Sequence, residues 1–285
     1  MASYTFTLED PDTVSGIAAL NVMDAGEDGM PIVFIHGLGA DHYEFIHQFR
    51  YFSAGRRCVA FDQRGFGRSP ATPNMGIERS VADLETLADD MGLDRFVLLG
   101  HSLGSMVAFE YTHRHPDRVE KLVIASGSPS LRESRVTYAG LKLIPVIGPF
   151  MEDRQRSTFS NVFGFNFGTF GMRTSPDVLR YYFKESPYAF SDKFFQSVLV
   201  YMHDLAAFDF RPRLNQLSCP TLVTHGLLDM SINALPSLLA ARKIPNVQIR
   251  VFPTCGHSPN IEAPAEFNTV LDNFIGLAEG AGDDN

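Results

Sequence analysis

The sequence has little of what disulfide frameworks, metal centres and membrane spans require. Only three of its 285 residues are cysteines, Cys58, Cys219 and Cys255, and they show no Cys-x-x-Cys spacing. We expect reduced, structural thiols and no metal site. No apolar run approaches the roughly 18 residues needed to span a bilayer, and the first ten residues lack both a basic start and an apolar block. These absences predict a cytoplasmic protein that does not act at a membrane.

Positive charge is also scarce. The chain has 24 lysines and arginines against 33 aspartates and glutamates, which gives a formal net charge of −9, and it contains no run of basic residues. Such a charge argues against nucleic acid as a partner. The chain is 45% hydrophobic and 20% charged, a composition typical of a globular protein with a large core. We expect one large domain, or one domain that carries an insertion.

Short apolar runs alternate with helix-periodic segments over most of the chain. Residues 4–23 read as two antiparallel strands, and the later apolar runs lie at 31–35, 58–62, 97–99, 119–125, 220–225 and 247–252. Segments with helical spacing lie at 43–53, 77–91, 233–243 and 263–277. Alternation of this kind is typical of an α/β fold whose parallel strands are joined by right-handed crossovers.

The alternation breaks between residues 130 and 207. Helix-like pieces separated by prolines replace the strands here, and twelve of the chain's 24 phenylalanines lie between Phe150 and Phe210. We predict an α/β core formed by residues 1–129 and 208–285, with residues 130–207 inserted as a helical cap. Phe163, Phe167 and Tyr182 are candidates to line an apolar substrate pocket beneath this cap. The alternative is that these aromatic side chains only build the core of the cap.

The pentad Gly100-His101-Ser102-Leu103-Gly104 joins an apolar strand to a helix-periodic segment. A Gly-x-Ser-x-Gly sequence in that context is typical of a nucleophile elbow, a tight turn that exposes the serine hydroxyl. A side chain at either glycine would collide where strand and helix converge. Ser102 is therefore the candidate nucleophile.

A serine nucleophile needs a base within hydrogen-bonding reach and an acid that orients the base. In a parallel sheet both must lie at the carboxyl ends of strands, where the serine is exposed. Of nine histidines, His257 alone stands in a loop directly after a late strand, and Asp229 follows the strand before it. These are the candidate base and acid, with Asp204 and Asp209 as fallback acids. The backbone N–H groups of Leu38 and Leu103 are candidates for the oxyanion hole.

Five ordered motifs resemble the α/β-hydrolase superfamily over nearly the whole chain. They are His36-Gly37-x-Gly39, Asp62-x-Arg64-Gly65-x-Gly67-x-Ser69, Gly100-x-Ser102-x-Gly104, Cys219-Pro220-Thr221-Leu222-Val223 and Gly256-His257-x₄-Glu262-x-Pro264. The resemblance implies an eight-stranded, mostly parallel sheet whose second strand is antiparallel, and a lid inserted after the sixth strand. Two departures stand out: Ser105 where many relatives have a second glycine, and Met230-Ser231-Ile232-Asn233 where a proline is frequent.

The resemblance implies a serine hydrolase that forms an acyl-enzyme and needs no cofactor. We predict cleavage of a small carboxylic ester or lactone by a monomer or homodimer. Four other enzyme activities stay open: hydrolysis of a carbon–carbon bond in vinylogous diketones, proline iminopeptidase, perhydrolase and membrane-surface lipase. A non-catalytic ligand-binding protein on the same fold is the alternative outside the enzymes.

Overall fold

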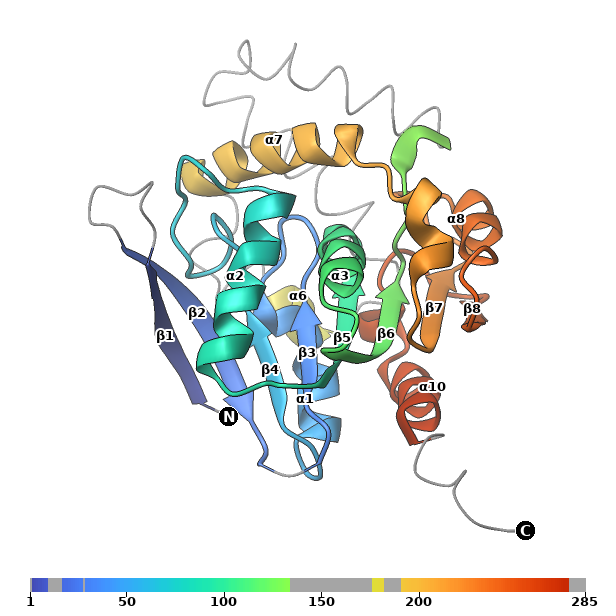
Figure 1. Ribbon diagram of the computed structural model, residues 1–285, viewed down its shortest axis with the longest axis horizontal. Coiled ribbons are helices and arrows are strands. Elements are labelled where there is room, and N and C mark those ends of the chain that lie inside the picture. Colours follow the sequence, from blue (N-terminus) through green and yellow to red (C-terminus); the bar gives the residue numbers. More distant parts are fainter. Residues whose placement is uncertain (1, 10–16, 28, 134–175, 182–190, 277–285) are drawn as a thin grey trace.

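A single twisted sheet forms the centre of the protein, as Figure 1 shows. The computed structural model describes residues 2–9, 17–27, 29–133, 176–181 and 191–276. The eight strands lie in the order β1-β2-β4-β3-β5-β6-β7-β8. Strand β2 runs antiparallel to both of its neighbours, β1 and β4, and the other pairings in the described part are parallel. The predicted α/β-hydrolase class is confirmed. The strands are β1 (Ala2–Glu9), β2 (Ile17–Ala25), β3 (Ile32–Ile35), β4 (Cys58–Phe61), β5 (Phe96–His101), β6 (Val119–Ala125), β7 (Thr221–Gly226) and β8 (Val247–Phe252).

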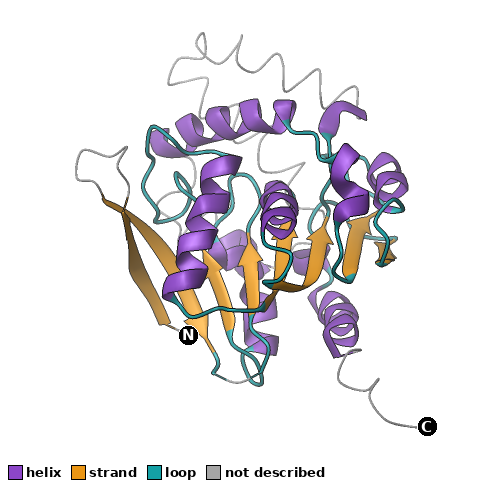
Figure 2. Cartoon of the chain, viewed as in Figure 1, coloured by secondary structure: helices purple, strands orange, loops and turns teal. Residues whose placement is uncertain are grey.

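Helices cover both faces of the sheet (Figure 2). One face carries α2 (Ile77–Asp90), α3 (Leu103–Arg114) and α8 (Ala234–Ala241). The other carries α1 (Ile46–Phe52) and α10 (Pro264–Gly276), and the short α9 (Pro259–Glu262) contacts both of these helices. In the part of the chain that the structure describes, no helix is long and apolar enough to cross a membrane.

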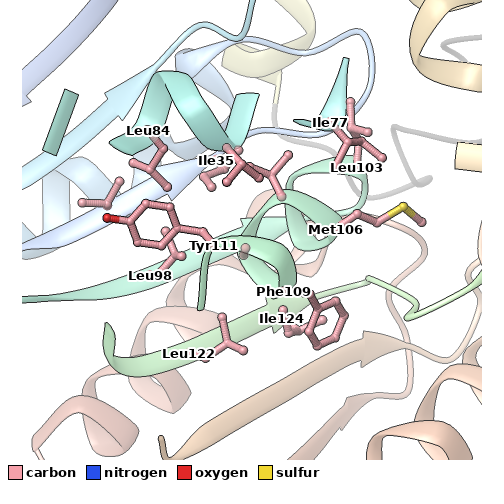
Figure 3. Close-up of a cluster of buried hydrophobic side chains, with 14 of the residues drawn as sticks. Ile35, Ile77, Leu84, Leu98, Leu103, Met106, Phe109, Tyr111, Leu122 and Ile124 are labelled. Atoms are coloured by element: carbon pink, nitrogen blue, oxygen red, sulfur yellow. The ribbon is translucent and has the colours of Figure 1, made fainter. Parts of the chain in front are cut away.

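Coverage on both faces explains why the central strands read as unbroken apolar runs rather than as alternating ones. Successive side chains still point to opposite faces. Val33 and Ile35 of β3 contact the cluster beneath α2 and α3, while Ile32 and Phe34 contact the cluster beneath α1 and α10. Figure 3 shows the first cluster, in which side chains of α2 and α3 meet those of β3, β5 and β6.

Two expected helices differ in detail from the structure. The helix expected over 43–53 is a 3₁₀ turn, η1 (His42–Phe45), followed by α1. The helix expected from residue 263 begins at Pro264 and is preceded by the short α9. Pro264 is well suited to the first turn of a helix, where its missing N–H has no partner to lose.

Three helical pieces are described between residues 130 and 207. They are η2 (Leu131–Glu133), α6 (Pro176–Arg180) and α7 (Asp192–Ala207). In Figure 1, α7 runs across the end of the sheet to which β3, β5 and β6 point. Lys193 of α7 donates from Nζ to the carbonyl oxygens of Gly67 and Ser69, both at 2.8 Å. At its other end, Asp204 Oδ2 accepts the N–H of Ile77 at 2.8 Å and so caps α2. The helix is thus fastened to two segments of the core.

Helix α3 lies unusually close to the sheet. Ten of its twelve residues are buried, and a Cβ placed on Gly104 would lie 2.1 Å from the carbonyl oxygen of Ile35 in β3. A Cβ on Gly100 would lie 2.3 Å from the carbonyl oxygen of Gly104. Backbone atoms cannot move aside as a flexible side chain can, so both positions require glycine, as the elbow motif predicts.

Replacing Gly104 should therefore destabilise the whole core. We expect Gly104→Ala to lower the free energy of unfolding by about 3 kcal/mol or more, because α3 must move away from β3. Urea denaturation followed by circular dichroism measures this. Gly55→Ala is the matched control, since a Cβ there meets nothing within 4 Å. Equal stability of the two variants would contradict the close approach of α3 to β3.

Candidate active site

Ser102 lies between β5 and α3 in a strained backbone conformation. Its φ of 52° and ψ of −115° lie in a region that L-residues avoid, at a cost on the order of 1–3 kcal/mol. The turn is held by the Ser102 N–H, which donates to the carbonyl oxygen of Ala125 at 3.0 Å. The serine is half-buried at the amino end of α3, where the dipole and the first N–H groups favour negative charge.

Ser105, the first departure from the family pattern, is accommodated by a glycine on a neighbouring strand end. Its Oγ donates to the carbonyl oxygen of Ser102 at 2.5 Å. A Cβ on Gly127 would lie 2.1 Å from that Oγ. The extra side chain therefore fills space that Gly127 leaves open and fastens the elbow.

Asp229 and His257 are brought together at the same edge of the sheet. Nδ1 of His257 lies 2.8 Å from Oδ2 of Asp229. The other carboxylate oxygen, Oδ1, accepts the N–H groups of Ser231 at 2.8 Å and Ile232 at 2.9 Å. A proline at either of these two positions would lack that N–H, which gives the second departure from the family pattern a structural role. The carboxylate is held at both oxygens and points one of them at the imidazole.

The fallback acids lie in other contacts. Asp204 caps α2, as described above. Asp209 pairs with Arg211, whose Nη2 lies 2.6 Å from Oδ2, and with Arg132 at 3.4 Å. Asp229 is therefore the acid that the structure places beside His257.

A second histidine also contacts the Asp229 carboxylate. Nε2 of His225, which is fully buried in β7, lies 3.1 Å from Asp229 Oδ2 and 3.0 Å from the carbonyl oxygen of Ile232. Burial alone would raise the pKa of the Asp229 carboxyl, but His257 and His225 together hold this pKa well below its usual range. The sequence pattern does not select His225, and nothing in its spacing indicates a contact with Asp229.

The loop that carries His257 is braced by Glu262. Both carboxylate oxygens of Glu262 accept the N–H of Gly256 at 3.0 Å, and Oε1 also accepts the N–H of Ser258 at 3.1 Å. These bonds hold the backbone on either side of His257. They explain why the glycine, the histidine and the glutamate recur as one motif.

Residues 36–39 carry the candidate oxyanion donor Leu38, so we call them the oxyanion loop, and they pass directly beside the elbow. A Cβ on Gly37 would lie 3.2 Å from Ser102 Cβ, so the loop's backbone contacts the serine. Leu38 stands in the turn closed by the Ala40 N–H on the Gly37 carbonyl oxygen, and Gly39 has a φ of 75°. Leu103 is the first residue of α3, where an N–H has no partner within the helix. The two candidate donors thus lie on segments that flank Ser102.

His36 fixes the start of the oxyanion loop. Its Nδ1 lies 2.8 Å from the Gly37 carbonyl oxygen, and its Nε2 accepts the N–H of Gln63 at 2.9 Å. Burial lowers the pKa of His36 despite the nearby charges of Asp62 and Glu44. Its ring therefore connects the segments that follow β3 and β4.

Beside this loop lies a buried cluster of Asp41, His42 and Asp62. Their potential ligand atoms are within 4.8 Å of one another, but His42 Nδ1 is hydrogen-bonded to Asp62 Oδ1 at 2.7 Å. Asp41 Oδ2 accepts the hydroxyl of Tyr181 at 3.0 Å, and the ring of Tyr181 stacks on Tyr43 at a centroid distance of 3.9 Å. Burial, reinforced by the charge of Asp62, raises the pKa of Asp41 to about 6. The cluster joins Tyr181, which directly follows α6, to η1.

The predicted substrate-binding residues Phe163, Phe167 and Tyr182 lie outside the described residues. Their assignment stays a prediction.

A family model described as the alpha/beta hydrolase fold matches residues 30–264 of the chain. Among curated proteins, a 2-hydroxymuconate semialdehyde hydrolase of Pseudomonas putida is 31% identical over 266 residues, which cover 91% of each chain. A putative carbamate hydrolase of Variovorax paradoxus is 26% identical over 90% of this chain and 95% of its own. Among solved structures, a thermophilic esterase from Thermogutta terrifontis superposes with a TM-score of 0.74 at 22% identity and covers 96% of this chain and 98% of its own.

The charge of Asp229 should contribute to stability in a pH-dependent way. Its folded-state pKa lies below the unfolded value, so the contribution is fully present above about pH 4 and is lost as the pH falls toward the folded pKa. We expect Asp229→Asn to cost on the order of 2 kcal/mol of unfolding free energy at pH 7. The difference from wild type should shrink below about pH 4. Urea titrations at pH 7, 5 and 3 measure it, and a difference that stays constant over this range would contradict the lowered pKa.

Proposed function

This chain belongs to the alpha/beta hydrolase family, and we propose that it is a serine hydrolase of carboxylic esters or lactones that works through an acyl-enzyme on Ser102. The observation that carries the proposal is the 2.8 Å contact between Asp229 and His257 at the sheet edge where Ser102 is presented in a strained turn. The ring of His101, the residue before Ser102, lies 4.9 Å from the ring of His257, centroid to centroid. The proposed nucleophile, acid and base thus follow β5, β7 and β8 at the same edge of the sheet.

In this proposal His257 takes the proton from Ser102 Oγ as the oxygen attacks the substrate's carbonyl carbon. Asp229 accepts from Nδ1, so Nε2 is the nitrogen that faces the reaction and can receive the proton. The N–H groups of Leu38 and Leu103 donate to the oxyanion, a term worth about 3 kcal/mol per donor. The alcohol leaves with the proton from His257, and the same histidine then activates water to release the acid.

We also propose that residues 130–207 form a cap over the site. The contacts of α7 with the core, and the stacking of Tyr181 on Tyr43, support this arrangement. Phe163, Phe167 and Tyr182 would line the acyl pocket beneath it. A cap of this kind excludes water from the acyl-enzyme until the leaving group has departed.

A second candidate is hydrolysis of a carbon–carbon bond in a vinylogous diketone. The relative from Pseudomonas putida, at 31% identity over most of both chains, favours it. The two candidates share the attack on a carbonyl carbon and differ in the leaving group, which is an alkoxide in one and a stabilised carbanion in the other. In both proposals the residues of the site act on the substrate's carbonyl group in the same way. Only an assay with both kinds of substrate therefore distinguishes ester hydrolysis from carbon–carbon bond hydrolysis.

Removing the hydroxyl of Ser102 tests the nucleophile. We expect Ser102→Ala to lower kcat by about 10⁴-fold or more with an unchanged fold, because no other group can form the acyl-enzyme. Ester hydrolysis by the variant, measured beside circular dichroism, checks this. Ser53→Ala, a serine at the end of α1, should turn over at the wild-type rate. Turnover retained by Ser102→Ala would refute the proposed mechanism.

The substrate class is tested with p-nitrophenyl esters of increasing acyl length, with a lactone and with a vinylogous diketone in parallel. We expect Ser102-dependent ester turnover with an optimum chain length, because a closed pocket accepts only a limited acyl volume. Cleavage of the diketone without ester turnover would favour the second candidate. Silence toward every substrate would instead indicate a ligand-binding protein.

A further inference from the structure

A buried pair of charged side chains lies beside the candidate site and takes no part in the proton transfers described above. Glu44 and His101 are 1% and 0% exposed, and Oε1 of Glu44 lies 2.8 Å from Nδ1 of His101. Taking such a pair out of water costs several kcal/mol per ion, and apolar residues of similar volume are often equally stable or more so. A contribution to stability therefore does not account for these two residues.

The contacts of the pair give a different account of it. The second carboxylate oxygen of Glu44, Oε2, accepts the N–H of Gly37 in the oxyanion loop at 2.9 Å. On the other side, Nε2 of His101 lies 2.9 Å from the carbonyl oxygen of His257. The pair thus connects the oxyanion loop to the backbone of the candidate base. One of its two members, His101, is also the residue that precedes Ser102.

The protons of His101 follow from these partners. A carbonyl oxygen only accepts, so Nε2 carries a proton, while Nδ1 faces a carboxylate. Burial alone would lower the pKa of His101, but Glu44 and the carbonyl of His257 raise it. Burial would likewise raise the pKa of Glu44, and His101 lowers it. Each side chain therefore favours the charged form of the other, and each also has one polar atom directed at an active-site segment.

We propose that Glu44 and His101 are positioning residues that hold the oxyanion loop and the His257 loop in register with Ser102. The proposal rests on the proposed function of that site. The three segments follow β3, β5 and β8, so each is anchored to a different strand. A displacement of about 1 Å between reacting groups costs roughly 10²-fold in rate. The hydrogen bonds of Glu44 to Gly37 and of His101 to His257, joined by the 2.8 Å contact between the two side chains, fix the separation of the loops in a way that apolar contacts do not.

The double variant Glu44→Leu/His101→Phe tests this directly, since it replaces both ions by apolar groups. We expect the urea concentration at the midpoint of unfolding to stay close to that of wild type, because no unpaired charge remains. We expect kcat to fall about 10²-fold while KM stays within about threefold. The rate at which a fluorophosphonate labels Ser102, followed by intact-protein mass spectrometry, should fall with kcat. A stable double variant with wild-type kcat and labelling would overturn the proposal.

Two single variants separate geometry from charge and cover the case in which the double variant does not fold. Glu44→Gln keeps an oxygen for the Gly37 N–H and an amide N–H for a neutral His101, so its rate should stay within about fivefold of wild type. His101→Gln can hold only one of the two contacts and should lose about tenfold or more in kcat. Equal rates for His101→Gln and wild type would also overturn the proposal.

The control is a partly exposed ion pair with a similar nitrogen-to-oxygen distance, away from the site. Arg57 pairs with Asp24 at 2.9 Å, next to the amino end of β4, and Arg57→Gln should leave kcat and labelling unchanged.

If the wild-type protein is labelled at Ser102 but hydrolyses no ester, the ester assignment fails and the labelling rates alone decide the positioning role. If the wild-type protein is neither labelled nor active, the proposed function and the positioning role fail together.

Discussion

The close approach of α3 to β3 and β5 is the constraint on which the candidate site depends. It exists because Gly100 and Gly104 present no Cβ to the backbone carbonyls that face them. The helix can then begin directly after β5, which leaves Ser102 with a positive φ and presents its side chain beside the oxyanion loop. Interactions elsewhere in the core, such as the apolar contacts in Figure 3, stabilise this arrangement without determining it.

Around the elbow, hydrogen bonds to the backbone keep the other loops in place. Glu262 holds the segment that carries His257, and Ser231 and Ile232 hold the carboxylate of Asp229. Most of these bonds pair a carboxylate with backbone N–H groups, which keeps the charged oxygens satisfied in a buried place. The loops that carry the proposed catalytic residues are thus held by hydrogen bonds between carboxylates and backbone N–H groups.

Much of this could be predicted from the sequence, because the relevant signals are local. Apolar runs marked the central strands, and the glycines around Ser102 marked the elbow. Position after a strand was enough to select Asp229 and His257, which lie together in the structure. Glu44 gave no such signal: it stands in a short 3₁₀ turn, and its role depends on His101 and Gly37, which come close only in the folded chain. The contact of His225 with Asp229 could not be predicted for the same reason, since no spacing rule connects the two residues.

The fit between Ser105 and Gly127 has a consequence for how this site can change over evolutionary time. A side chain at position 127 collides with the hydroxyl of Ser105, so such a substitution is closed to a lineage that carries serine there. Once position 105 becomes glycine, the obstacle from Ser105 disappears, and the contact that remains among those nearest to position 127 is with Cγ2 of Ile124 at 2.8 Å. The order of mutations therefore matters: a substitution at position 127 depends on which residue stands at position 105, although neither residue takes part in the proposed reaction.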